Sequence, residues 1–248
     1  MKNKSLNIII FVLCIVLVIL VILYIQNDKS YGYKEETTTT SVTTTSTTTS
    51  VSINKSEIPD YSGNAVIEIN SNKPEFSDSD YNTESFEIYS SLDSLGRCGV
   101  AYANIGVDLM PTEKRGSISN VKPSGWQSVK YDNVPGKYLY NRCHLIGYQL
   151  TGENDNDKNL ITCTRYMNAT TMLYYEDLTA DYIKKTNNHV LYRVTPIYTD
   201  DDLVAKGVQM EISSVEDKCN ALCYNVFLYN IQDGIEIDYK TGESVRSE

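Results

Sequence analysis

The sequence has little positive charge for its length. Its 248 residues carry 22 Lys and Arg against 32 Asp and Glu, which gives a formal net charge of -10. This balance argues against a protein that holds nucleic acid over a broad basic surface, because such binding depends on cations that displace counterions from phosphates. It does not exclude a nucleic-acid substrate, since a small basic groove or a bound divalent cation can reverse the charge locally.

Histidine is scarce, with only His144 and His189 present, and the sequence has no Cys-x-x-Cys pair and no closely spaced histidine pair. A zinc site is therefore disfavoured. Five cysteines follow the N-terminal apolar run: Cys98, Cys143, Cys163, Cys219 and Cys223. An odd number cannot all pair within one chain, and Cys219–Cys223 is the first candidate disulfide, with Cys143–Cys163 the second.

One long hydrophobic run occupies residues 7–25, after a short tip at 1–6 that carries Lys2 and Lys4. At about 1.5 Å per residue the run spans roughly 28 Å, close to the thickness of a hydrocarbon core. No small-x-small pattern follows it, so we expect an uncleaved, single-pass signal anchor with the tip in the cytoplasm and the rest of the chain outside the cell. The alternative is a cleaved signal peptide and a secreted protein.

Residues 26–54 are expected to form a disordered stalk, because the Thr/Ser tract at 36–52 offers almost nothing to bury. Beyond it, residues 55–248 have the mixed composition of one folded extracellular domain. No internal repeat is present. Alternating apolar and polar residues predict strands at 65–69, 99–105, 137–143, 190–198, 204–212, 221–229 and 235–239.

One strong helix is predicted at 169–185, where apolar residues such as Met172, Tyr175 and Ile183 recur at helical spacing. Strands before and after a single helix, without regular βαβ alternation, favour an α+β domain built on an antiparallel sheet.

His144 ends one of the predicted strands, and Arg142 lies two residues earlier on the same face. A lone histidine in such a run is most often packed or hydrogen-bonded without a chemical role. A histidine that titrates near neutrality can also take a proton from water, while a neighbouring guanidinium grips a phosphate. Arg142 could equally form a surface ion pair. His189 opens a strand without charged neighbours, and we expect it to be structural or solvated.

Asn168 precedes the predicted helix and could simply cap it. Its amide oxygen could instead bind a hard cation such as Mg²⁺, which retains most of its waters. Glu176 lies eight residues further, about two helical turns, so it returns to nearly the same face. There it could orient a water in the metal's shell, although an exposed helical glutamate is usually only solvated.

The segments YLYNRCHLIGYQLTGE and KNLITCTRYMN, with Asn159 and Asn168 in the second, resemble the DNA/RNA non-specific endonuclease family of the ββα-metal (His-Me finger) superfamily. The likeness is greatest to the secreted and membrane-bound nucleases of streptococci and related Gram-positive bacteria. It extends from about residue 58 to 242.

The resemblance implies a metal-dependent hydrolase of DNA, and of RNA as well, with an antiparallel core and a ββα-metal motif. His144 matches the general base, Asn168 the metal ligand and Glu176 the helical glutamate, while Asn159 matches a supporting asparagine. Arg142 matches the motif arginine and Arg115 a substrate-binding arginine. Arg165 is a further phosphate-contact candidate because it lies three residues before Asn168. The implied cofactor is Mg²⁺, with Mn²⁺ as a substitute.

The match departs from the broader family's Asp-Arg-Gly-His motif, because Asn141 and Cys143 replace the acid and the glycine. These changes leave two alternatives. One is a stalked surface adhesin or binding module whose catalytic site has degenerated, and the other is a phosphodiesterase that acts on a non-nucleic substrate.

Overall fold

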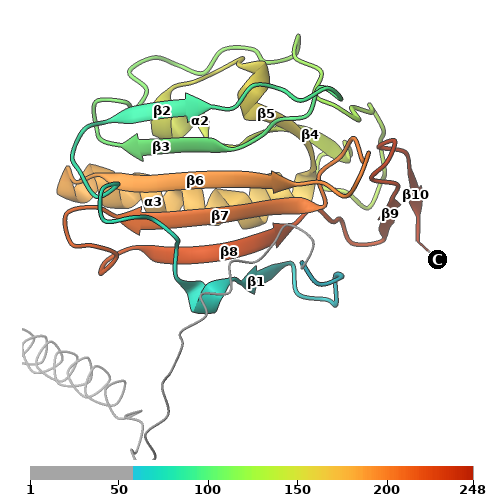
Figure 1. The fold of residues 1–248 in the computed structure, drawn as a ribbon. Coiled ribbons are helices and arrows are strands. Elements are labelled where there is room, and N and C mark those ends of the chain that lie inside the picture. The colour runs from blue at the N-terminus through green and yellow to red at the C-terminus, as the bar shows by residue number, and fades with distance from the viewer. Residues whose placement is uncertain (1–57, 248) are drawn as a thin grey trace, which may run out of the picture. The chain divides into compact units, whose positions relative to one another are not determined.

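The computed structural model describes residues 58–247, and its main feature is a six-stranded antiparallel sheet with one long helix behind it (Figure 1). The strand order is β1-β8-β7-β6-β3-β2. The helix is α3 (Leu173–Thr186). The strands are β1 (Val66–Glu68), β2 (Phe86–Tyr89), β3 (Ala101–Ile105), β6 (Val190–Ile197), β7 (Gly207–Ser214) and β8 (Cys223–Tyr229).

Alternation along the central strands explains how the sheet and α3 form one core. In an extended chain every second side chain points to the same face, so a period of two makes one face apolar. The apolar face packs into one cluster with Tyr175, Ala180 and Ile183 of α3. The strand residues in that cluster are Ala101, Ala103, Ile105, Val190, Tyr192, Val194, Val208, Met210, Ile212, Val226 and Leu228.

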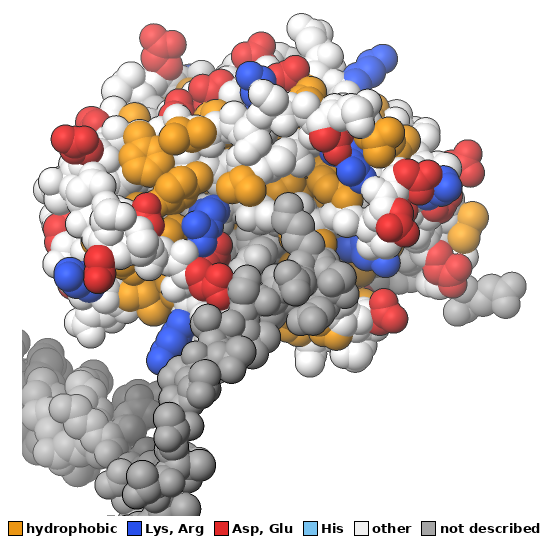
Figure 2. Space-filling view, viewed as in Figure 1, with side chains coloured by type: hydrophobic (Ala, Val, Ile, Leu, Met, Phe, Trp, Pro, Cys, Tyr) orange, Lys and Arg blue, Asp and Glu red, His pale blue; other side chains and the backbone are white. Residues whose placement is uncertain are grey.

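The opposite face of the sheet, which is turned to the viewer in Figure 2, carries acidic, basic and hydrophobic side chains interspersed. Arg193 of β6 and Glu211 of β7 are cross-strand partners and form an ion pair of 2.6 Å. The segment before β2 closes over this pair, because the main-chain nitrogen of Glu75 donates to Glu211 and Arg193 donates to the Glu75 oxygen. The charged pair on the sheet is thus hydrogen-bonded both within itself and to the main chain of Glu75.

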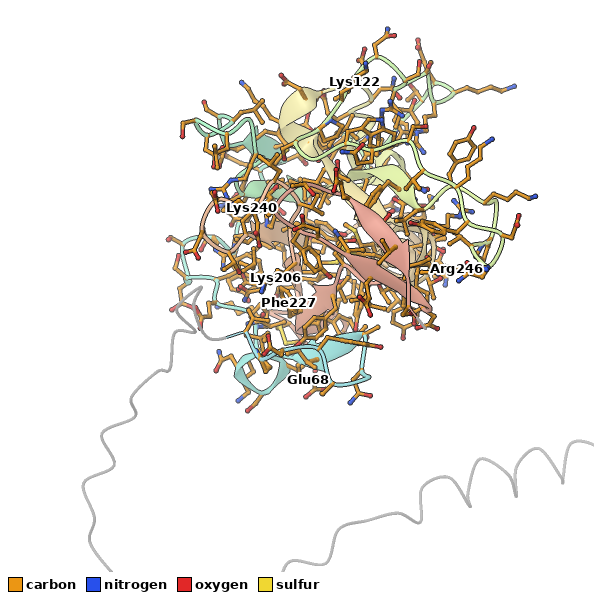
Figure 3. All side chains as sticks on the ribbon, turned by 90° about the vertical axis from the view of Figure 1, so that its right-hand side faces the viewer. Glu68, Lys122, Lys206, Phe227, Lys240 and Arg246 are labelled. Carbon is orange, nitrogen blue, oxygen red and sulfur yellow. A yellow bond between two sulfur atoms is a disulfide. The ribbon has the colours of Figure 1, made fainter. Side chains whose placement is uncertain are left out.

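Two small sheets flank the main one. A hairpin of β9 (Ile235–Ile237) and β10 (Ser244–Arg246) faces the viewer in Figure 3, where Arg246 is labelled. The other sheet pairs β4 (Tyr140–His144) with β5 (Leu160–Thr164) in antiparallel register, from Tyr140 opposite Thr164 to His144 opposite Leu160.

The chain between β4 and β5 contains only short helices, α2 (Tyr148–Thr151) and η2 (Asp157–Asn159). After β5 it enters η3 (Met167–Met172), a π-helical turn that continues directly into α3. Strands β4 and β5 followed by this helix make a ββα unit; in Figure 1 the two strands lie at the upper right and α3 runs behind β6 and β7.

The α+β architecture on an antiparallel sheet is therefore confirmed, with local differences. The strand predicted at 137–143 begins only at Tyr140, because Lys137 adopts a left-handed φ of 68° that interrupts an extended chain. Strands β2, β5 and β10 were not predicted. The helix predicted from 169 begins earlier as the π turn, so Asn168 lies within the first turn and makes no capping hydrogen bond there.

Both candidate disulfides are confirmed. Cys143 of β4 bonds to Cys163 of β5, with their Cα atoms 5.9 Å apart, and Cys219–Cys223 closes the turn before β8. Cys98 is a free, buried thiol, and burial raises its pKa to about 12.

The predicted tip, anchor and stalk at 1–54 lie outside the described residues. From residue 58 to 247, no helix is long and apolar enough to cross a membrane.

Candidate active site

His144 is the last residue of β4 and is almost completely buried, with 6% of its surface exposed. Its Nε2 lies 2.7 Å from the main-chain oxygen of Asn154, in the loop between the two strands. A carbonyl oxygen can only accept, so Nε2 must carry the proton and Nδ1 must carry the lone pair. Nδ1 faces the Nη2 atom of Arg115 at 3.3 Å. The basic atom of the ring is thus Nδ1.

The surroundings of His144 keep the ring neutral. Its pKa is lowered from 6.5 to about 4, mainly by burial and also by the positive charge of Arg115, while the hydrogen bond to Asn154 opposes the change. At neutral pH an imidazole with this pKa is unprotonated and able to accept a proton.

Asn159 fixes the chain just beyond His144. Its side chain is fully buried, and its Oδ1 accepts from the Ile146 nitrogen at 2.9 Å while its Nδ2 donates to the Ile146 oxygen at 3.0 Å. The main-chain oxygen of Asn159 also accepts from the Leu145 nitrogen. The predicted supporting residue therefore holds the loop that leaves β4, without touching the imidazole itself.

Asn168 lies in the π turn, and a second asparagine orients its amide. Nδ2 of Asn168 donates to Oδ1 of Asn141 at 3.3 Å, and Nη1 of Arg165 donates to the same oxygen at 3.2 Å. With its nitrogen so engaged, the Asn168 oxygen is left as the free end of the amide, and within residues 58–247 no hydrogen bond occupies it.

Glu176, on the first turn of α3, lies against the backbone of Gly147. A Cβ at that glycine would come within 2.5 Å of Glu176 Oε2, so only glycine allows the carboxylate this position. The pKa of Glu176 is raised to about 7, mainly by burial and to a smaller extent by Asp177, while Gln149 and Arg115 oppose the shift. The side chain is half-buried against Gly147 and is not the fully solvated surface glutamate that the sequence also allowed.

These groups meet in one cavity of about 380 Å³. Its walls include five of the seven predicted site residues: His144, Asn168, Glu176, Arg115 and Arg165. The structure thus brings together residues from β4, the π turn, α3 and an exposed loop. Asn159 lies behind the cavity in the β4–β5 connection.

Arg142 takes a different position. Its guanidinium stacks on Trp126 with 4.0 Å between Cζ and the ring centre, and it donates to the main-chain oxygens of Val121 and Ser119. It lines a neighbouring cavity of about 490 Å³, which shares Arg115, Arg165 and Asn168 with the first. Its predicted contact with phosphate stays a prediction.

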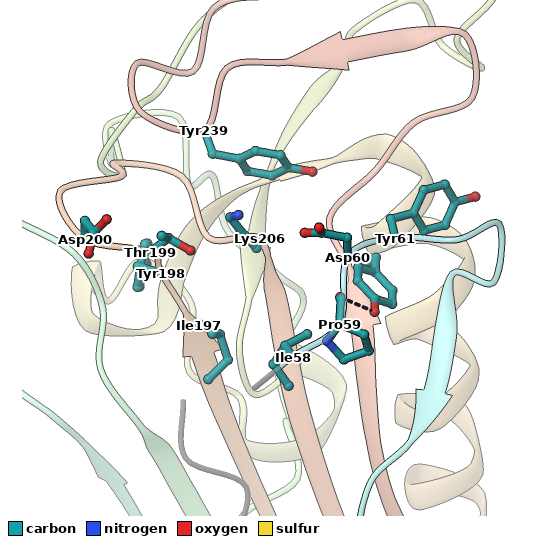
Figure 4. A pocket seen from close by; sticks show the side chains of 11 residues that line it. Ile58, Pro59, Asp60, Tyr61, Ile197, Tyr198, Thr199, Asp200, Lys206 and Tyr239 are labelled. Atoms are coloured by element: carbon teal, nitrogen blue, oxygen red, sulfur yellow. Dashed lines mark hydrogen bonds between the residues drawn. The ribbon is translucent and has the colours of Figure 1, made fainter. Parts of the chain in front are cut away.

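A larger cavity, of about 660 Å³, contains none of these residues (Figure 4). It lies between the N-terminal segment from Ile58 and the loop after β6, with Asp60, Lys206 and Tyr239 in its wall. Size does not identify the site here, because the groups capable of chemistry converge in the smaller cavity.

The smaller cavity suits a hard divalent cation. Its lining offers oxygen ligands, among them the free amide oxygen of Asn168 and the carboxylates of Glu176 and Asp177, and it has room for water molecules. Within residues 58–247 no three His, Cys, Asp or Glu side chains group as a metal cage. A cation bound at Asn168 would therefore keep most of its waters, as Mg²⁺ prefers.

Sequence reasoning overlooked three contributors to the site. Asn141 was noted only as a departure from a motif, yet its oxygen orients both Asn168 and Arg165. Asn154 acts through its main chain, which no side-chain pattern reveals. Trp126 is the chain's only tryptophan, and this was the one sequence feature that could have drawn attention to it.

Comparisons with known proteins identify the family and the fold. A family model described as DNA/RNA non-specific endonuclease matches residues 77–216, which is more than half of the chain. The structure of NucA from Streptococcus agalactiae with a bound magnesium ion is similar, with a TM-score of 0.65 and 27% identity over 74% of this chain and 87% of that one.

Two more distant structures share the fold. The Sda1 nuclease with a bound zinc ion has a TM-score of 0.60 at 24% identity, and it covers 74% of this chain and 97% of its own. A protein described as an extracellular endonuclease has a TM-score of 0.52 at 21% identity, with 65% and 86% covered. The chain therefore belongs to the DNA/RNA non-specific endonuclease family, and it is a nuclease of the ββα-metal fold.

Proposed function

We propose that this nuclease is a Mg²⁺-dependent endonuclease that hydrolyses phosphodiester bonds of DNA and RNA outside the cell, with little preference for sequence. The observation that carries the proposal is the neutral, buried His144, whose basic Nδ1 opens on the cavity that also holds Asn168 and Glu176. A base and a cation ligand facing one cavity are what hydrolysis of a phosphodiester by water requires.

His144 would accept a proton at Nδ1 from the water that attacks phosphorus. Nε2 keeps its proton and continues to donate it to the Asn154 oxygen, and this hydrogen bond keeps the ring oriented and stabilises the imidazolium that forms. Arg115 donates to Nδ1 in the absence of substrate, so it must leave this atom before the water can approach. A phosphate would attract its guanidinium away, because charge-assisted bonds to phosphate are stronger than a bond to neutral imidazole.

Asn168 is the protein ligand that we assign to Mg²⁺, and Mn²⁺ could take its place. The ion, when bound, supplies Lewis-acid stabilisation of the negative charge that builds up on the phosphate. Asn141 accepts from Nδ2 of Asn168 and so leaves the amide oxygen free for the ion, while Arg165 donates to the same Asn141 oxygen. Glu176 would orient water there through its carboxylate. The magnesium ion in the related NucA structure supports this choice of metal.

Lack of sequence preference follows from the groups available. The charged donors in the cavity are Arg115 and Arg165, and guanidinium groups recognise phosphates, which are the same at every nucleotide. The net charge of -10 is compatible with this role, because the arginines and the cation make the site locally positive.

An extracellular location, anchored by residues 7–25 or secreted after their removal, rests on two observations. The hydrophobic run is long enough to span a membrane, and the domain contains the disulfides Cys143–Cys163 and Cys219–Cys223, which persist in oxidising compartments. We place the protein on the surface of a Gram-positive bacterium.

The direct test is incubation of the full-length protein with plasmid DNA, with structured RNA and with a small phosphodiester, each with Mg²⁺ or with a chelator. We expect Mg²⁺-dependent degradation of both nucleic acids to short products. Persistence of both polymers with Mg²⁺ would overturn the proposal. Hydrolysis of the small diester alone would then indicate a non-nucleic substrate, and no hydrolysis at all would indicate a binding module.

A further inference from the structure

The cavity beside the catalytic one has an unusual charge for this protein. About 490 Å³ in volume, it is bordered by three arginines: Arg115, Arg142 and Arg165. Of the residues from 58 to 247, no Asp or Glu lines it. The whole chain has a net charge of -10, yet the described lining of this cavity contains arginines and no carboxylate. The cavity lies next to the proposed base, His144. Such a pocket favours an anion.

Aromatic rings form the other part of the wall. Trp126 and Tyr138 both line the cavity, and each has a cation over its ring: Arg142 lies 4.0 Å from the centre of Trp126, and the Lys130 Nζ lies 4.5 Å from that of Tyr138. Tyr138 is 48% exposed. Exposed aromatic rings next to cations are the combination with which proteins bind single-stranded nucleic acid, the rings stacking on bases and the cations following the backbone.

The cavity also lies where a substrate strand would pass. It shares Arg115, Arg165 and Asn168 with the catalytic cavity, so one strand could occupy both. Arg142 and His144 alternate along β4 and thus project to one face, so the residue lining this cavity lies beside the catalytic histidine.

We propose that this cavity is a nucleotide subsite next to the scissile phosphate, in which an unstacked base lies against Trp126 and Tyr138 while Arg142 and Arg165 contact the backbone. The inference rests on the proposed nuclease function and adds the form of the substrate. A base can reach these rings only after leaving its helical stack, which costs least in a single strand. The enzyme therefore binds unpaired strands more tightly than duplex.

The chain carries its own probe of this subsite, because Trp126 is its only tryptophan. The full-length protein is titrated with a single-stranded oligonucleotide in the presence of chelator, so that no cleavage is required. We expect saturable quenching of the indole emission by stacking. A matched oligonucleotide of abasic residues should bind through its phosphates but leave the emission nearly unchanged. Equal quenching by both, or binding without quenching by either, would overturn the subsite.

Variants separate stacking from general charge. Tyr138→Ala should weaken binding of the base-containing strand by roughly 10-fold while hardly changing that of the abasic strand, and Tyr138→Phe should bind as the wild type does. Tyr174→Ala is the matched control, since Tyr174 is also exposed, at 57%, but lines neither cavity. If Tyr138→Ala binds both strands as the wild type does, the subsite is wrong.

Failure of the subsite and failure of the proposed function are distinguishable. Binding is measured without metal, whereas degradation of plasmid DNA is measured with Mg²⁺. Degradation without base-dependent quenching would refute the subsite alone. Base-dependent quenching without degradation would support the subsite and refute the hydrolytic role.

Discussion

His144 and Asn154 are joined by a hydrogen bond of 2.7 Å from the imidazole Nε2 to a main-chain oxygen. The bond decides which ring nitrogen is basic, because a carbonyl accepts but never donates. It also means that the ring's orientation depends on the backbone of the β4–β5 connection. The adjoining part of that connection is held by the buried Asn159 through its two bonds to Ile146.

His144→Ala should reduce kcat by roughly 10²- to 10⁴-fold, the usual contribution of a general base. His189→Ala is the matched control, since the chain has only these two histidines and His189 bonds to Glu216 at 2.8 Å, outside both cavities. Initial rates on plasmid DNA, with circular dichroism to verify folding, provide the measurement. A His144→Ala variant near the wild-type rate would remove the assignment of the base.

Asn168→Ala should abolish turnover or greatly raise the Mg²⁺ concentration needed for half-maximal rate, because it removes the amide oxygen. Asn168→Asp keeps an oxygen ligand and should retain measurable activity. Asn141→Ala leaves Asn168 in place but removes its hydrogen-bond acceptor, so we expect an intermediate loss of about 10- to 100-fold. Rates measured across a Mg²⁺ titration test whether the loss is largest for Asn168→Ala and smaller for the other two variants. Identical metal dependence in all three variants would exclude Asn168 as the ligand.

Stability should depend on pH through Glu176. Its pKa is raised from 4.5 to about 7 in the folded protein, so its contribution is fully present below pH 4.5 and is lost as pH rises through 7. In chelator, the wild type should lose about 2 kcal/mol between pH 5 and 8 relative to Glu176→Gln, a figure reduced because the side chain is partly exposed.

Urea unfolding at several pH values measures this difference, with Asp181→Asn, an exposed carboxylate of the same helix, as control. His144 acts in the opposite sense: its contribution is present above pH 6.5 and is lost as pH falls toward 4. The contribution of His144 to the pH dependence cancels in the comparison, because the wild type and both variants retain this histidine. Parallel profiles for wild type and Glu176→Gln would show that the carboxylate is not enclosed in solution.

Removal of the Cys143–Cys163 disulfide by substitution of both residues with Ala should cost about 3 kcal/mol, because the bond closes a loop with a sequence separation of 20. The melting temperature should fall by roughly 6–12 °C. The pair Cys219–Cys223, with a separation of 4, is the control, and its removal should cost less, about 2 kcal/mol. Calorimetry of the oxidised proteins compares the stability lost on removal of each disulfide. An equal loss for the two, or a larger loss for Cys219–Cys223, would contradict the prediction.

The sequence predicted the sheet well because the apolar period of two continues over long strands. The pairing of Val190–Ile197 with Gly207–Ser214 was recoverable from alternation and one polar turn. Strand β5 was missed because all five of its residues, Leu160 to Thr164, are buried, and a strand buried on both faces has no alternation. Strand β2 was missed because none of its residues is buried.

The site was predictable as a set of residues but not as an arrangement. His144, Asn168 and Glu176 could be proposed from residue type and spacing, and they do line one cavity. The π turn could not be predicted, because a single wider turn does not change the apolar periodicity of the sequence enough to be recognised. The placement of Arg142 on Trp126 depends on tertiary contacts between segments far apart in the sequence, which strand geometry alone does not give.

If the protein is exported as proposed, the crosslink between β4 and β5 ties the completion of the hairpin that carries His144 to the chain's export. Cytosolic thiols stay reduced, so a newly made chain holds Cys143 and Cys163 unlinked for as long as it shares a compartment with the genome that encodes it. In the proposed extracellular enzyme, the Cys143–Cys163 bond, which fixes the strand bearing His144, would form only after export. A bacterium that makes such a nuclease would thus have part of its protection against self-digestion built into the enzyme's maturation.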